Sequence, residues 1–211
     1  VTEAQQPAFT VRVNQALDRD LTVTLTNGAK VVIAAGQTEA VYRADAQGDD
    51  VFKDAGSLTL GVREATVEGA SFENLQFGGS ATVQIADTIS DVMATLTADK
   101  TTVTEGGQIT YTVTLSNADG LPVTGHDGLR FTLTDGTVVE IAKGSATGTA
   151  TITVADDVFV GGQPAIAQSI TGVTGTERFE NLVTTGSTST TITDETGTPS
   201  NPGTPGTPNG G

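Results

Sequence analysis

Apolar and polar residues alternate along several stretches of this chain. In residues 111–116 Tyr, Val and Leu occupy every second position, and Thr or Ser stands between them. The same alternation occurs in residues 81–85 and 149–154. A period of two buries one face of a strand and leaves the other in water, which is typical of antiparallel sheets. Because no segment shows a helical period, the pattern predicts an all-β protein built from short strands.

Two dipeptides indicate tight turns between such strands. Asn27-Gly28 and Asp135-Gly136 each follow a run of alternating residues. Dipeptides of this kind are typical of two-residue hairpins, in which both turn residues adopt positive φ. We therefore expect both residues of each dipeptide to lie in the left-handed region.

An internal repeat defines the domain organisation. Short segments of the first half recur in the second half in the same order, which is the signature of repeated domains. The matched pairs are Val1-Thr2-Glu3 and Val103-Thr104-Glu105, Leu25–Gly28 and Leu133–Gly136, Asp49–Phe52 and Asp156–Phe159, Phe72–Leu75 and Phe179–Leu182, and Ile85–Asp87 and Ile192–Asp194. About seven short strands in each copy predict two tandem immunoglobulin-like antiparallel β-sandwiches.

The repeat also suggests domain limits, with the first sandwich in residues 1–91 and the second in 92–196. A strand-like lead-in at residues 92–103 precedes only the second copy of Val-Thr-Glu, so we expect the N-terminal strand of the first sandwich to be truncated. Residues 197–211 contain only Gly, Thr, Pro, Ser and Asn. Such a segment buries no apolar surface and is expected to be a flexible linker.

The composition excludes several classes of protein. A formal net charge of −15 repels phosphate backbones, so we expect no nucleic-acid partner. The absence of Cys excludes disulfides and thiolate metal sites. No apolar run reaches the length of a membrane-spanning helix, so we expect no membrane insertion. With 4% aromatic residues, each core must be thin and built mainly from aliphatic side chains.

Catalytic chemistry has little support in the sequence. Nucleophilic catalysis needs a base beside the nucleophile, and the single His of the chain, His126, lies in a short insertion where we expect it to be exposed. The sequence contains no phosphate loop, zinc-ligand spacing or nucleotide-binding fingerprint. We therefore expect no catalytic residue, no organic cofactor and no enzymatic activity.

Acidic residues recur at equivalent places in both copies, each at a strand end or in a turn. Adjacent Asp residues repel each other unless they are solvated or bound to a cation. Strand ends gather at the poles of a sandwich, so carboxylates distant in sequence can converge there and supply the oxygen ligands that calcium prefers. The spacing alone leaves two alternatives open, a calcium site or ordinary solvated turns.

Longer motifs resemble known families. The segment Val-Thr-Glu-Gly-Gly-Gln-Ile-Thr-Tyr-Thr-Val-Thr-Leu-Ser-Asn at residues 103–117, the Leu-Thr-Asp-Gly hairpin, Asp-Asp-Val-Phe and Phe-Glu-Asn-Leu resemble the extender repeats of giant biofilm adhesins, the LapA type of RTX adhesin. The order Val-Thr-Glu-Gly-Gly, Ala-Asp-Asp and Thr-Ile-Thr-Asp-Glu also resembles the Calx-β motif. In combination these motifs cover nearly all of residues 1–196.

The resemblance implies calcium ligands. In Calx-β domains the Glu of the first strand, the paired Asp and the Asp that closes the last strand bind the ion. The matching residues, with Asp91 of the linker and Glu195 added, form the candidate metal set: Glu3, Asp49, Asp50, Asp87, Asp91, Glu105, Asp156, Asp157, Asp194 and Glu195. The Glu that usually follows the paired Asp is missing here, where residues 160–163 read Val-Gly-Gly-Gln, so one ion per site is expected.

The resemblance also implies a function. We expect structural extender repeats of a secreted adhesin at the bacterial cell surface, associated with the outer membrane, that support surface attachment and biofilm formation. Calcium would stiffen the domain junctions, the partners would be neighbouring repeats of the same chain, and the protein would be a monomer. The alternative is a module that binds a glycan or a protein through its loops, with the insertion around His126 and Arg130 as the candidate surface.

Overall fold

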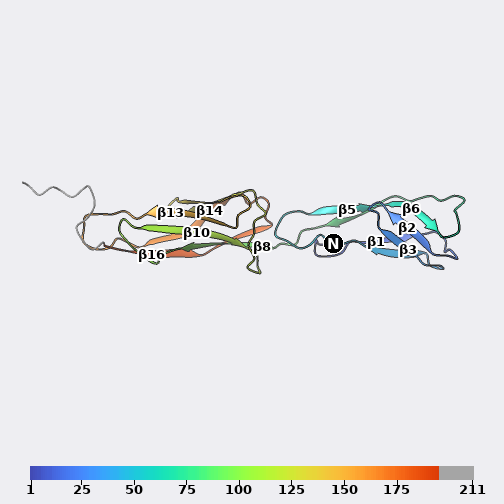
Figure 1. The fold of residues 1–211 in the computed structure, drawn as a ribbon, viewed down its shortest axis with the longest axis horizontal. Coiled ribbons are helices and arrows are strands. Elements are labelled where there is room, and N and C mark those ends of the chain that lie inside the picture. The colour runs from blue at the N-terminus through green and yellow to red at the C-terminus, as the bar shows by residue number, and fades with distance from the viewer. Residues whose placement is uncertain (195–211) are drawn as a thin grey trace, which may run out of the picture. The chain divides into compact units, whose positions relative to one another are not determined.

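The chain folds entirely into β-structure over the part that the structure describes. The structure, a computed structural model, describes residues 1–194. It forms two compact units, unit 1 (Val1–Thr88) and unit 2, which begins at Ile89 (Figure 1). Every regular element of residues 1–194 is a β-strand, which confirms the predicted all-β class. The linker expected at residues 197–211 lies outside the described residues, as does Glu195.

Unit 2 is a sandwich of two sheets. One sheet has the order β13-β10-β8-β15, and the other has the order β12-β11-β14-β16-β9. The strands are β8 Asp91–Ala98, β9 Thr102–Thr104, β10 Gln108–Ser116, β11 Leu129–Leu133, β12 Val138–Ile141, β13 Thr147–Thr153, β14 Ile166–Thr174, β15 Asn181–Thr185 and β16 Ser187–Thr193. Most neighbours are antiparallel, but β15 pairs with β8 in parallel and so does β16 with β9.

The core of unit 2 lies between the two sheets, where the alternating residues meet. Tyr111, Val113 and Leu115 of β10 have no exposed surface, and Phe131 of β11 faces them with none either. Ile152, which we also expect to point inward, is half buried because it lies on the edge strand β13. The period-two pattern therefore places the apolar face correctly, with burial decreasing toward the sheet edge.

Unit 1 repeats this arrangement with fewer strands. Its sheets have the orders β1-β4, β3-β2-β6 and β5-β7. The strands are β1 Ala8–Arg12, β2 Leu21–Leu25, β3 Lys30–Ile33, β4 Glu39–Arg43, β5 Gly56–Leu60, β6 Val62–Val67 and β7 Ala81–Ile85. A cluster of buried aliphatic side chains and one Phe forms its core: Phe9, Leu21, Val23, Leu25, Val31, Ile33 and Leu60.

The hairpin turns differ from the prediction. Gly28 and Gly136 have φ of 86° and 88°, but no residue other than glycine has positive φ in the described part of the chain. Gly28 N–H donates to Leu25 O at 2.9 Å, and Leu25 N–H donates to Ala29 O at 2.8 Å, so the strands are joined by a longer loop that ends in a left-handed glycine. The expectation of positive φ at the first residue of each dipeptide was wrong. The Asn27 side chain instead accepts a hydrogen bond from Ala29 N–H at 3.1 Å.

Candidate metal centre

Two parallel strand contacts bring the first Glu of each repeat to the end of the last strand. In unit 2, β9 and β16 run in parallel with Thr104 opposite Thr193, so the residues that follow both strands emerge at the same pole. Glu105 N–H then donates to Thr193 O at 2.9 Å. In unit 1 a parallel bridge between Thr2 and Ala86 likewise brings Glu3 to the end of the last strand. Glu3 N–H donates to Ala86 O at 3.1 Å.

Glu3 is a fully buried acid whose side chain is only half satisfied. Its exposed fraction is 0%. Oε1 accepts hydrogen bonds of 3.0 Å from both the backbone N–H and the hydroxyl of Thr88. Oε2 is buried and has no hydrogen-bond partner among the described residues. Burying a carboxylate oxygen without compensation is costly, so a ligand at this atom would stabilise the fold.

Two further carboxylates of unit 1 converge on Glu3. One carboxylate oxygen each of Glu3, Asp50 and Asp54 lies within 4.8 Å of the others. Asp50 Oδ1 also accepts a hydrogen bond of 2.6 Å from Phe52 N–H, which fixes the turn that presents it. Three carboxylates at this separation repel one another, and a bound cation removes that repulsion. These groups could hold a metal ion.

Asp54 is a member of this cluster that the sequence comparison did not identify. The acids predicted from the sequence recur in both copies, whereas the position equivalent to Asp54 in the second copy is Gly161. The usable signal was local, since Asp54 follows Asp50 in the same loop, two residues before β5 begins at Gly56. A search for acids clustered within one loop would have found it.

Asp87 also brings a carboxylate oxygen within 4.8 Å of one of Glu3, whereas Asp49 lies beside the cluster. Asp87 Oδ1 accepts a hydrogen bond of 3.3 Å from the backbone N–H of Asp54. Asp49 Oδ1 accepts a short hydrogen bond from the hydroxyl of Thr88. The predicted acids of the first repeat therefore do gather in one place, with Asp49 and Asp87 anchoring Thr88 and the Asp54 loop.

Unit 2 buries its first Glu in the same manner. Glu105 is 5% exposed, and its Oε2 accepts a hydrogen bond of 3.2 Å from Asp157 N–H. Its Oε1 is buried without a hydrogen-bond partner in the part of the chain that is described. A half-satisfied buried carboxylate thus recurs at the same topological position in both repeats.

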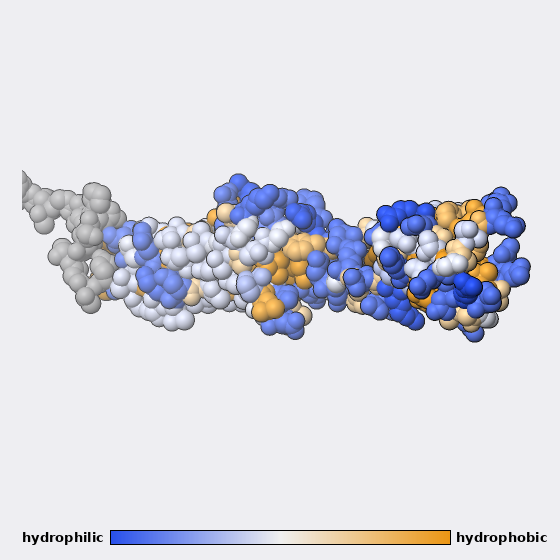
Figure 2. Space-filling view, turned by 45° about the vertical axis from the view of Figure 1, so that its right-hand side comes forward, coloured by the Kyte–Doolittle hydropathy of each residue, from blue (hydrophilic) through white to orange (hydrophobic). Residues whose placement is uncertain are grey.

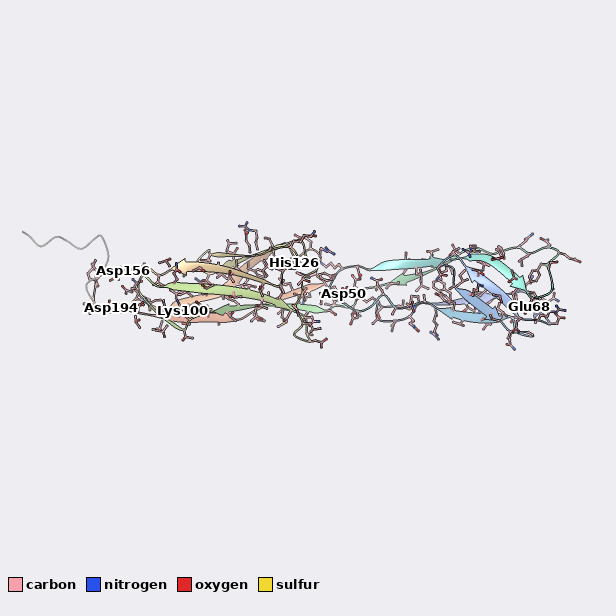
Figure 3. The ribbon with its side chains drawn as sticks, in the orientation of Figure 1. Asp50, Glu68, Lys100, His126, Asp156 and Asp194 are labelled. Carbon is pink, nitrogen blue, oxygen red and sulfur yellow. The ribbon has the colours of Figure 1, made fainter. Side chains whose placement is uncertain are left out.

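The other acids of unit 2 are held by backbone and amide donors. Asp194 Oδ2 accepts from Gly161 N–H at 2.9 Å, and Asp157 Oδ1 accepts from Phe159 N–H at 2.8 Å. Figure 3 shows half-buried Asp156 and Asp194 at one end of unit 2, opposite the end that carries His126. Within residues 89–194, no three acidic groups meet as closely as the cluster of unit 1.

Asp91 has a local role in the structure. It is the first residue of β8, and its Oδ1 accepts a hydrogen bond of 2.8 Å from the Asn181 side chain at the start of β15. This bond joins the first residues of the parallel pair β8–β15. Participation of Asp91 in a metal shell stays a prediction.

His126 is buried, contrary to the sequence-based expectation of an exposed loop residue. Its exposed fraction is 1%, Nε2 lies 2.8 Å from Ser145 O, and Nδ1 accepts from Gly128 N–H at 3.1 Å. Its ring packs edge-on against Phe179 at 6.0 Å. Because the imidazole is enclosed, it organises the insertion from within and offers no surface to a glycan.

A model of the LapA domain matches residues 1–88 and 91–196 of this sequence. The chain belongs to the LapA domain family. Because the match occurs twice, each unit corresponds to one LapA domain, and the resemblance to LapA-type adhesin repeats is confirmed. LapA domains are adhesin-related repeats, so membership indicates a surface-associated protein. Residues 1–194 include no long apolar helix of the kind that crosses a membrane.

Several solved structures are similar to this LapA-domain chain in fold. CBD12 from CALX1.2 is 14% identical over 92% of this chain and 96% of its own, with a TM-score of 0.34. The amphioxus IgVJ-C2 molecule is 14% identical over 92% and 99%, with a TM-score of 0.36. The D0-D1 domain of intimin is 16% identical over 90% of both chains, with a TM-score of 0.25. No curated protein matches the sequence. These likenesses do not bear on function.

Proposed function

We propose that this chain consists of two structural extender repeats of a secreted adhesin at the bacterial cell surface, each of which binds one calcium ion at the end of its sandwich. Membership of the LapA domain family supports the adhesin role. The observation that carries the calcium role is the fully buried Oε2 of Glu3, which has no hydrogen-bond partner among the described residues and belongs to a carboxylate that meets Asp50 and Asp54.

The ligand chemistry favours calcium over other metals. All candidate ligands are carboxylate oxygens, whereas zinc sites are usually built from His and Cys. Magnesium requires near-ideal octahedral geometry, while calcium accepts irregular shells of six to eight oxygens. Three carboxylates leave room for backbone carbonyls and water to complete such a shell. Millimolar extracellular calcium suits the affinity of typical extracellular modules, about 10⁻⁴–10⁻³ M.

The ion would order the point where the chain leaves unit 1. Thr88 is the last residue of that unit, and both its N–H and its hydroxyl donate to the buried Glu3 carboxylate. Fixing the Glu3 carboxylate therefore fixes Thr88. We infer that bound calcium stiffens the passage into the next repeat, which suits a spacer that holds a distal binding module away from the cell. This role requires no catalysis.

The second repeat should bind its ion more weakly. It has the buried Glu105 but carries Gly161 at the position of Asp54, so one carboxylate is lost. Asp156, Asp157 and Asp194 are the remaining candidates at that pole. Removing a negative ligand from a calcium site lowers its affinity.

Calorimetric titration of calcium into metal-free protein tests this function. The expected result is heat of binding at two sites of unequal affinity. The double variant Glu3→Gln with Asp54→Asn should lose the tighter site and keep the weaker one. Glu39→Gln is the matched control, because Glu39 is an exposed acid of unit 1 whose partner is Arg12 at 2.9 Å. Absence of binding heat in the wild-type protein at millimolar calcium would refute the proposal.

A further inference from the structure

Three side chains inside unit 2 are polar where their equivalents in unit 1 are apolar. The first is Tyr111 of β10, which pairs with Ala150 as Phe9 of β1 pairs with Tyr42. Tyr111 has no exposed surface, and its phenol oxygen is buried without a hydrogen-bond partner among residues 1–194. Phe9 belongs to the apolar core of unit 1 and lacks that oxygen. Unit 2 therefore buries a hydroxyl group that the same fold does without in unit 1.

The other two polar side chains are Gln168 of β14 and Thr188 of β16, which lie directly opposite each other. In unit 1 the equivalent pair is Leu60 of β5 and Ala81 of β7. The backbone N–H of the residue after Gln168, like that of the residue after Leu60, donates to the hydroxyl of the Thr that follows β11 or β2, at 3.1 Å in both units. This shared hydrogen bond fixes the equivalence of the two pairs.

The three polar groups of unit 2 lie together and are only partly satisfied. Gln168 is 3% exposed, and its Oε1 accepts a hydrogen bond of 3.3 Å from Asp135 N–H. Burial, and then the Asp135 carboxylate, raise the pKa of the Tyr111 phenol, whereas the Gln168 amide lowers it, so the amide lies beside the phenol. That contact falls short of a hydrogen bond, and Thr188 Oγ1 is likewise buried without a partner among residues 1–194. Buried polar groups without partners cost free energy, which a ligand that reaches them would offset.

A hollow of about 390 Å³ is lined by Gln168 and Thr188. The rest of its lining is small and mostly carries hydroxyl groups: Thr134, Ala167, Ser169, Ser187 and Ser189. No charged side chain of the described residues lines it. Figure 2 shows pale surface over much of unit 2, the unit on the left, which is the colour of residues of intermediate hydropathy such as Ser and Thr. The volume lies within the range of small-molecule sites, about 300–1,000 Å³.

A second hollow, of about 300 Å³, adjoins the first along residues 187–189. Its other side is formed by residues 96–98 of β8 with Lys100 and Thr101. Gly186 directs the chain between the two hollows, because its φ is 87° and a Cβ there would lie 2.6 Å from Leu96 O. The position of residues 187–189 is therefore fixed by the backbone, and a ligand can extend from the first hollow into the second.

The lining selects a neutral ligand that is rich in hydroxyl groups. An ionised group would find no opposite charge in the first hollow, and an apolar group would leave the hydroxyls without partners. Hydroxyl and amide side chains both donate and accept hydrogen bonds, as the hydroxyl groups of a sugar do.

We propose that the first hollow binds one ring of a neutral oligosaccharide, with the Gln168 amide at its base and Ser and Thr hydroxyls around it. A change of rotamer turns the Thr188 hydroxyl toward the ring. Tyr111 lies behind Gln168 and acts as a positioning residue for the amide. The next ring of the oligosaccharide lies in the second hollow. Unit 1 does not share this site, because Leu60 and Ala81 replace its polar base.

The test is an NMR titration of the isotopically labelled full chain with three neutral trisaccharides, of glucose, mannose and galactose. At least one of them should shift the side-chain NH₂ signals of Gln168 and the amide signals of residues 187–189. The signals of unit 1 should stay in place and serve as the internal control. The anionic trisaccharide of galacturonic acid should bind about tenfold more weakly, because its carboxylates find no opposite charge in the first hollow.

The residues of unit 1 supply the matched variant. Gln168→Leu combined with Thr188→Ala gives unit 2 the apolar pair of unit 1, so it should keep its melting temperature and bind the sugar about tenfold more weakly. Ala167→Phe fills the first hollow from an exposed position and should abolish binding in a folded protein. Thr149→Ala removes an exposed hydroxyl of β13 outside both hollows and should bind as the wild type does.

The proposal is wrong if none of the neutral sugars shifts the Gln168 side-chain signals at millimolar concentration. Binding that survives both the double variant and Ala167→Phe would place the sugar elsewhere on the chain. Equal binding of the anionic trisaccharide would show unspecific contact with the surface and would also overturn the proposal.

Discussion

The backbone N–H of Asp157 donates a hydrogen bond of 3.2 Å to Oε2 of Glu105, although 52 residues separate them along the chain. This bond ties the loop after β13 to the end of β9, and it uses one oxygen of a carboxylate that is 5% exposed. The other oxygen, Oε1, has no hydrogen-bond partner in the described part of the chain. Glu3 repeats the pattern in unit 1 with Thr88 as the donor. In both repeats, therefore, a buried carboxylate has one oxygen that accepts a hydrogen bond and one oxygen that has no hydrogen-bond partner among residues 1–194.

Neutralising either Glu should lower stability in calcium but not in chelator. Glu3→Gln removes a buried charge, so without calcium it should leave unit 1 as stable as wild type or more stable. In calcium the wild type gains about 2.7 kcal/mol at a hundredfold excess over the dissociation constant, and the variant should lose that gain. Hydrogen exchange resolved by segment measures both effects, and Glu105→Gln should act on unit 2 alone. A variant that is less stable than wild type in chelator would contradict the assignment.

Substitution by proline should cost less stability in β1, which pairs with one strand of the described residues, than in β10, which pairs with two. Thr112 is the equivalent of Thr10, and it faces β8, opposite Thr97. Thr112→Pro removes a ladder hydrogen bond from a central strand and should destabilise unit 2 by at least about 2 kcal/mol. Thr10→Pro removes only an edge N–H and should cost less than about 1 kcal/mol.

Urea unfolding followed by NMR signals of each unit measures the proline effect. The two variants serve as each other's control, because they make the same substitution at the same position of the repeat. Equal losses of stability would show that the β1 edge is already paired in solution.

His126 should contribute to stability and not to ligand binding. His126→Ala removes a 1% exposed ring that contacts Ser145 O and packs against Phe179. The cavity and the lost contacts should cost about 2–4 kcal/mol. Arg130→Ala is the control in the same region, because its pair with Glu140 is exposed and such pairs contribute about 0–1 kcal/mol. Thermal unfolding measures both, and an unchanged melting temperature for His126→Ala would reject this role.

Tyr111 should make unit 2 sensitive to alkaline pH. Burial, and then the Asp135 carboxylate, raise the pKa of its phenol above the ordinary value of 10.0. The unfolded chain ionises this phenol near pH 10, so the folded state holds the proton to higher pH. The resulting stability is complete below about pH 10 and is lost as pH rises through the folded pKa. Tyr111→Phe should reduce the loss of stability as pH rises above 10, measured by urea unfolding.

Local patterns in the sequence were sufficient for the fold class and for the core. The alternation around Tyr111, Val113 and Leu115 predicts three inward side chains, and all three are fully buried. Strand periodicity is a nearest-neighbour property of the backbone, so it can be recognised without knowledge of the partner strand. The recurrence of Glu3 as Glu105 likewise identifies the one acid that is buried in each repeat within residues 1–194.

Tertiary structure decided what depends on contacts between distant segments. Asp54 joins Glu3 only because a parallel bridge at Thr2 brings the start of unit 1 to its last strand, and no local pattern records that meeting. His126 is enclosed because Phe179, from a segment far along the chain, packs against its ring. The sequence by itself determined which residues alternate, repeat and carry charge. Which carboxylates share a pole followed from strand pairing, because the energy of that arrangement comes from groups that are far apart in the chain.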